Sequence, residues 1–111
     1  MTGPQTGAGR NQKGAQAERD LVHWLKDHRG VDAERVRSGR SLDAGDVVWA
    51  GSPYHLDVKH QGRWSVQGWF RELEEETSVA PEPYDPLLVL RRPGIINPGE
   101  WLAVLKVEDL L

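Results

Sequence analysis

The sequence predicts an α/β domain in which a mixed sheet of about five strands is flanked by helices, in the order αβββαββ. Three observations favour this class. Two segments carry apolar residues at the spacing of a helix, two apolar runs in the middle of the chain flank a short turn, and two more apolar runs follow the second helical segment. The chain has 111 residues, which is the size of one domain.

The first helix is expected over residues 15–28, where apolar side chains recur at helical spacing before Gly30 ends the pattern. Residues 1–13 are mostly Gly, Gln, Thr and Pro with almost no apolar side chains, so we expect a disordered basic arm there. No linker-like segment divides residues 14–111, which are expected to form a single domain.

Three strands are expected after the first helix. The first covers residues 33–37 and leads into a loop of Ser, Gly and Arg at 38–41. The next two form a hairpin, with strands at 46–50 and 54–59 around a turn at 51–53. This hairpin carries the most informative residues of the chain.

Asp57 and Lys59 lie two residues apart in the second strand of the hairpin. Because residues i and i+2 of a strand point to the same face, the two side chains are expected side by side. Leu56 and Val58 then face the core. A carboxylate that holds a cation, with an ammonium group beside it, is the arrangement of a small active site.

The second helix is expected after Ser65, a residue that can cap it. Its apolar side chains fall at positions i, i+3, i+4 and i+7, namely Val66, Trp69, Phe70 and Leu73. Three prolines then break the chain, and two strands are expected at residues 87–90 and 101–105.

Glu18 is the second candidate functional residue, because a helical projection places it between Leu21 and Val22 on the apolar side of the first helix. A carboxylate there needs a partner, since a lone buried charge is costly. A cation bound jointly with Asp46 and Asp57 would supply one. The alternative is that Glu18 lies at the edge of the apolar side and pairs with an arginine. The candidate arginines are Arg19, Arg35 and Arg37.

Whether Asp46 and Asp57 share a face depends on the register of the hairpin, because a shift by one residue turns every side chain to the other face. If Asp46 pairs with Asp57, both carboxylates point the same way. If Asp46 pairs with Val58, a bulge or a bend at Gly45 is needed to turn the Asp46 carboxylate to the face of Asp57. Asp43 is a rival for Asp46. The alternative to a site is an ordinary turn aspartate and a surface ion pair.

The net charge is −3, but the first part of the chain is basic and the last part acidic. A local basic face can attract a polyanion in spite of the net charge. There is no cysteine, which excludes disulfides, thiolate zinc sites and cysteine nucleophiles and indicates an intracellular, cytoplasmic protein. No apolar run has the length of a membrane span or the pattern of a signal peptide, so a soluble protein is expected.

In combination, these motifs resemble the PD-(D/E)xK nuclease superfamily and, within it, the archaeal-type Holliday junction resolvases. The resemblance covers residues 12–107 and follows the family's order of motifs. The motifs are the segment from Lys13 to Val22 with its acidic Glu18, then Ser38-Gly39, Gly45-Asp46-Val47-Val48, Leu56-Asp57-Val58-Lys59 and Gln67. Gly45 stands where the family commonly has a proline, and the chain is more acidic than such resolvases.

The resemblance implies a restriction-endonuclease-like fold and a metal-dependent endonuclease that hydrolyses DNA to 5′-phosphate and 3′-hydroxyl ends. The implied ligands of Mg²⁺ or Mn²⁺ are Asp46, Asp57, the Val58 carbonyl and Glu18. Lys59 would orient or deprotonate the attacking water, and Gln67 would hold that water or a phosphate.

The implied substrate is branched DNA, above all a four-way junction, cut by a homodimer because a junction has two symmetric cut points. The candidate DNA contacts are Arg10, Lys13, Arg37, Ser38, Gly39, Arg40 and Arg63. Two rivals stay open. One is another nuclease of the same superfamily that acts on nicked, flapped or linear DNA, and the other is a catalytically silent nucleic-acid-binding module.

Overall fold

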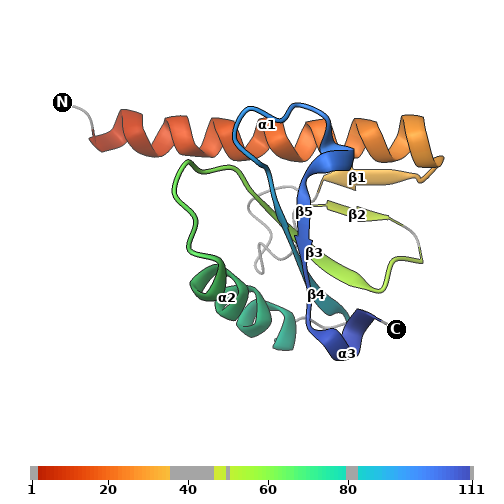
Figure 1. Ribbon diagram of the computed structural model, residues 1–111. Coiled ribbons are helices and arrows are strands. Elements are labelled where there is room, and N and C mark those ends of the chain that lie inside the picture. The colour runs from red at the N-terminus through yellow and green to blue at the C-terminus, as the bar shows by residue number, and fades with distance from the viewer. Residues whose placement is uncertain (1–2, 36–46, 50, 80–82, 111) are drawn as a thin grey trace.

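A computed structural model describes residues 3–35, 47–49, 51–79 and 83–110, with side chains from Ala15 onward. Its elements are α1 (Gly3–Arg29), β1 (Ala33–Arg35), β2 (Val47–Trp49), β3 (Tyr54–Lys59), α2 (Val66–Ser78), β4 (Asp85–Leu90), the 3₁₀ helix η1 (Pro98–Glu100), β5 (Leu102–Val104) and α3 (Val107–Leu110) (Figure 1). The predicted α/β class, five-stranded mixed sheet and order αβββαββ are confirmed. The short helices η1 and α3 are additions that the apolar pattern does not predict.

The strands follow one another across the sheet in the order β1-β2-β3-β4-β5. β3 and β4 are parallel, and every other neighbouring pair in this sheet is antiparallel. Parallel neighbours need a crossover connection, and α2 lies in that crossover. β3 is therefore an inner strand, with β4 along its whole length on one side and β2 on the other.

The two long helices cover opposite faces of the sheet (Figure 1). On the α1 face, Leu56 and Val58 of β3 are buried together with Leu21. On the α2 face, Leu88 of β4 is buried with Leu73. Alternate residues of a strand point to opposite faces, so the polar residues of β3 that alternate with Leu56 and Val58 lie on the α2 face.

α1 begins at Gly3, earlier than the helix predicted from residue 15. The segment 1–13, predicted as a disordered arm, is therefore helical from Gly3 onward in the structure. Once a helix has nucleated, each further residue adds one hydrogen bond, so a helix that packs on the sheet can extend into a segment without apolar residues. Long as it is, α1 is not apolar enough to cross a membrane, and the same holds for the other helices in the described ranges.

η1 packs closely against α1 at Gly99 and Trp24. A Cβ atom on Gly99 would lie 2.8 Å from Cζ2 of the Trp24 ring, so this approach requires glycine. The Asn97 side chain accepts a hydrogen bond from the Gly99 N–H at 3.0 Å. The contact holds the connection between β4 and β5 against α1.

Candidate functional site

Asp57 and Lys59 lie side by side on the α2 face of β3. Lys59 Nζ is 3.6 Å from Asp57 Oδ2, and the two side chains are 26% and 18% exposed, respectively. Leu56 and Val58 are buried on the other face, so the predicted placement of these four residues is confirmed. The two charged groups are partly removed from water but still accessible from it.

Trp69 of α2 contacts the ammonium group of Lys59. Lys59 Nζ lies 5.8 Å from the centroid of the Trp69 ring, which is within the range of a cation–π interaction. The contact restricts the direction in which the Lys59 side chain extends from the strand. The sequence pattern predicts that Trp69 lies on the apolar side of α2. It does not predict the contact with Lys59, because that contact depends on how the crossover lies on the sheet.

His55 is buried on the same face of β3, two residues before Asp57. Its Nδ1 is 2.8 Å from Thr77 Oγ1, which itself donates a hydrogen bond to the Leu73 carbonyl at 2.6 Å. Because the hydroxyl has only one proton, the imidazole Nδ1–H is the donor to Thr77. This hydrogen bond holds α2 against the strand that carries Asp57 and Lys59.

Glu18 forms an ion pair with Arg35, on the other side of the sheet from Asp57 and Lys59. Arg35 Nε donates to Glu18 Oε1 at 2.8 Å, and the Glu18 side chain is 13% exposed. Of the two environments predicted for Glu18, the structure therefore shows the pairing with an arginine. α1 covers one face of the sheet, whereas Asp57 and Lys59 point to the other. The predicted convergence of Glu18 on Asp57 is thus not observed in the described part of the chain.

The Glu18–Arg35 pair is expected to stabilise the fold. Glu18→Ala and Arg35→Ala should each lower the free energy of unfolding by about 1 kcal/mol, because each removes a charge-assisted hydrogen bond at the boundary between α1 and β1. The double variant should lose about as much as either single variant, since the two residues share one interaction. Chemical denaturation of the four proteins measures this coupling. Strictly additive losses would show that the pair contributes nothing to stability.

Several predicted residues lie outside the described part of the structure. These are Asp46, its rival Asp43, Arg37, Ser38, Gly39 and Arg40, together with the side chains of Arg10 and Lys13. Gln67, the second residue of α2, and Arg63 in the preceding loop are both exposed. Among the residues that the structure describes, neither is hydrogen-bonded to Asp57 or Lys59.

A metal site needs several donors close together. Within the described ranges, no group of three or more His, Cys, Asp or Glu residues is arranged to hold a metal. Asp57 supplies one carboxylate, and the predicted further donors are the Val58 carbonyl and Asp46. Oxygen donors of this kind fit Mg²⁺ and Mn²⁺. Metal binding at Asp57 stays a prediction that depends on the segment before β2.

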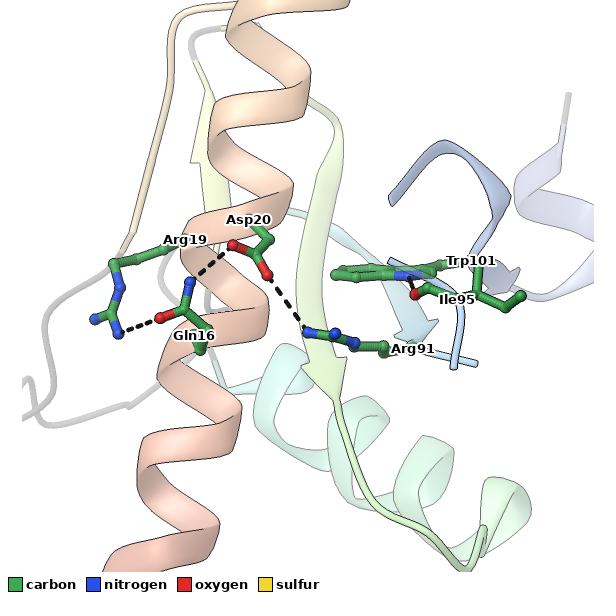
Figure 2. A network of polar contacts seen from close by, with 6 residues as sticks. All are labelled: Gln16, Arg19, Asp20, Arg91, Ile95 and Trp101. Atoms are coloured by element: carbon green, nitrogen blue, oxygen red, sulfur yellow. Dashed lines mark hydrogen bonds and ion pairs between the residues drawn. The ribbon is translucent and has the colours of Figure 1, made fainter. Parts of the chain in front are cut away.

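A polar network joins α1 to the chain that follows β4 (Figure 2). Gln16 Nε2 donates to Asp20 Oδ1 at 2.8 Å, and Arg91 Nη1 donates to Asp20 Oδ2 at 3.4 Å. The Arg91 guanidinium also lies 5.2 Å from the centroid of the Trp101 ring, and Trp101 Nε1 donates to the Ile95 carbonyl at 2.7 Å. The network holds the end of the sheet at which β3 also finishes. Sequence reasoning missed it because Asp20 and Arg91 are 71 residues apart.

The adjacent Asp57 carboxylate and Lys59 ammonium group suit a ligand that combines a cation with an anion. The Asp57 carboxylate can bind the cation, and the Lys59 ammonium group, held by Trp69, can bind an anion such as a phosphate oxygen. No protein-family model matches the chain. The functional interpretation therefore depends on this pair of residues and on its position in the sheet.

Proposed function

We propose that this protein is a Mg²⁺-dependent endonuclease of the Holliday junction resolvase type, which cleaves branched DNA as a homodimer. The observation that carries the proposal is the Asp57–Lys59 pair, 3.6 Å apart on an inner strand of an αβββαββ domain. A carboxylate and an ammonium group at this distance can hold a divalent cation and a phosphate oxygen next to each other. The sequence resemblance to the PD-(D/E)xK nucleases supports the same chemistry.

The register of the hairpin supports a second carboxylate at the same place. β2 pairs with β3 in an antiparallel manner, with Val47 opposite Leu56. If the strand continued by one residue in this register, position 46 would lie opposite Asp57. Opposite residues of an antiparallel pair point to the same face, so an aspartate at position 46 would join Asp57 on the α2 face. Asp46 itself lies outside the described residues, and its part in the site belongs to the proposal.

The proposed roles follow from the charges of these side chains. Asp57, with Asp46 and the Val58 carbonyl, would hold Mg²⁺ or Mn²⁺. When bound, the ion would supply neutralisation of the scissile phosphate and a water molecule of lowered pKa. Lys59 donates a hydrogen bond to a non-bridging phosphate oxygen and stabilises the negative charge that develops there.

Hydrolysis then proceeds in line. The water oxygen forms a new bond to phosphorus while the bond from phosphorus to the 3′ oxygen breaks, and a proton passes to that oxygen. The products are a 5′-phosphate and a 3′-hydroxyl end. Gln67 is exposed at the start of α2, where it would orient the water or a phosphate. Glu18, paired with Arg35, acts in this proposal through the stability of the fold.

A four-way junction is the proposed substrate because recognition by charge and shape needs no base-reading helix. Each copy of the chain carries one Asp57–Lys59 pair, and a junction has two symmetric cut points. Two copies are therefore needed to cut both strands.

The test uses a synthetic four-way junction, a flap and a linear duplex, each incubated with the protein in Mg²⁺ or in EDTA. We expect cleavage selective for the junction in Mg²⁺, no cleavage in EDTA, and recovery when excess Mg²⁺ is added back. Equal cleavage of all three substrates would favour a nuclease of broader specificity. Tight binding of the junction without cleavage would favour the catalytically silent module and overturn the proposal.

A further inference from the structure

Two rows of side chains meet between β3 and α2. On β3, alternate residues share the face that α2 covers, and they are His55, Asp57 and Lys59. On α2, Trp69 and Thr77 lie at positions i and i+8 and both contact that row. The rows match in length, because four steps along a strand and eight along a helix each span about 12–13 Å. The helix can therefore contact both ends of the strand's polar row.

Contacts at both ends fix how α2 lies along β3. At one end, Lys59 Nζ lies 5.8 Å from the centroid of the Trp69 ring. At the other end, Nδ1 of the buried His55 is 2.8 Å from Thr77 Oγ1. Between them, Leu73 is buried in the core cluster against which Trp69 packs. Sliding of the helix along the strand would break these contacts together, so the Trp69 ring has a fixed place beside the end of β3.

We propose that Trp69 is a positioning residue, which holds the Lys59 ammonium group where that group meets a phosphate oxygen of the substrate. This role rests on the proposed function. A long lysine side chain loses rotamer freedom when it is held in one direction. Because the Trp69 ring is fixed before any ligand binds, that loss is incurred during folding and not during the reaction.

Asp57 alone does not explain how Lys59 is held. Its Oδ2 is 3.6 Å from Lys59 Nζ, and partly exposed ion pairs of this kind contribute little. In the proposed reaction, the Asp57 carboxylate also binds the cation, which then competes with the ammonium group for the same oxygens. The Trp69 ring has no net charge and attracts the ammonium group through its face. It remains a partner for Lys59 when Asp57 holds a metal.

The first experiment is an NMR measurement on the protein alone, with ¹³C-labelled lysine. The chain has four lysines, so the ε-methylene signals are few, and Lys59→Met identifies the signal of Lys59. We expect these protons to be shifted upfield relative to the other lysines, because the end of the side chain lies over the Trp69 ring. Trp69→Leu should move the signal into the range of the other lysines. Trp69→Phe keeps a ring and should retain part of the shift.

Trp64→Leu is the matched control for this measurement. Trp64 packs against the same core cluster as Trp69, and none of the contacts found among the described residues joins it to Lys59. The control should leave the Lys59 signal in place. Circular dichroism and thermal melting check that each variant is folded. An unshifted Lys59 signal in the unaltered chain, or a shift that survives Trp69→Leu, would overturn the inference.

The second experiment is single-turnover cleavage of a four-way junction at saturating protein and Mg²⁺. Trp69→Leu should slow cleavage by about two- to thirtyfold, the rate equivalent of one cation–π interaction, with an unchanged Kd for the junction. Trp69→Phe should recover part of the rate. In the Lys59→Met background, Trp69→Leu should cause no further loss, since no ammonium group is left to position. An equal further loss in that background would show that Trp69 acts only through the fold and would overturn the inference.

The two measurements also distinguish this role of Trp69 from the proposed function. If the unaltered chain cut no DNA while the Lys59 signal responded to Trp69→Leu, the proposed function would fail and the positioning of Lys59 would stand. If the unaltered chain and Trp69→Leu cut the junction at the same rate, the proposed function would stand and the role of Trp69 would be overturned.

Discussion

Replacement of Asp57 by asparagine is expected to abolish Mg²⁺-dependent DNA cleavage while the fold remains intact. Asparagine has nearly the same shape as aspartate but lacks the charge that would hold the cation on β3. Loss of metal-assisted charge stabilisation is worth several kcal/mol, so the cleavage rate should fall by about a thousandfold or more. Single-turnover cleavage of a four-way junction at saturating protein measures this change without a contribution from weaker DNA binding.

We expect Asp57→Asn to lose its activity without a comparable loss of stability. The Asp57–Lys59 ion pair is 3.6 Å long and partly exposed, so its loss should change the free energy of unfolding by less than about 1 kcal/mol. Asp85→Asn is the matched control, because Asp85 is a partly exposed aspartate opposite Tyr54, at the other end of the same pair of strands. Cleavage by Asp57→Asn at the rate of the control would contradict the proposed site.

Replacement of Lys59 by methionine is expected to reduce the cleavage rate by about 10²- to 10⁴-fold, the usual contribution of a positioned acid, base or charged group. Methionine keeps an unbranched apolar stem that can lie against Trp69, so the packing between β3 and α2 should persist. What is lost is the ammonium group that would stabilise the charge developing on the phosphate. Rates at saturating Mg²⁺ separate this effect from weaker metal binding.

Two further variants test whether the effect of Lys59→Met is specific to position 59. Lys59→Arg retains the positive charge in a different geometry and should recover part of the activity. Lys26→Met removes a positive charge from an exposed site in the last turn of α1 and should leave the cleavage rate unchanged. If Lys59→Met and Lys26→Met had the same modest effect, Lys59 would act only through the long-range attraction between surface cations and DNA.

Comparison of these variants also distinguishes the proposed nuclease from a binding module. In a nuclease, Asp57→Asn and Lys59→Met still bind the junction but cut it slowly. In a silent module, the unaltered chain and both variants bind equally well and none of them cuts. A gel-shift measurement with the same junction provides the binding half of this comparison.

The sequence by itself determined the elements that have a regular period. Apolar residues at the spacing of a helix predicted the core of α1 and α2, and the alternation in the hairpin predicted that Asp57 and Lys59 share a face. These predictions depend only on the geometry of a single helix or strand. That geometry sets the spacing of apolar residues along the sequence, so it can be read from the order of neighbouring residues. Helix ends follow local periodicity less closely, and α1 accordingly begins at Gly3 instead of near residue 15.

Only the tertiary structure decided which elements face one another. α1 and α2 cover opposite faces of the sheet, so Glu18 meets Arg35 and lies on the other side from Asp57, although its position on the helix admitted either partner. The contact of Trp69 with Lys59 likewise depends on how the crossover lies on the sheet. Such pairings arise from the packing of whole layers, whose arrangement is a property of the complete chain and not of any local pattern.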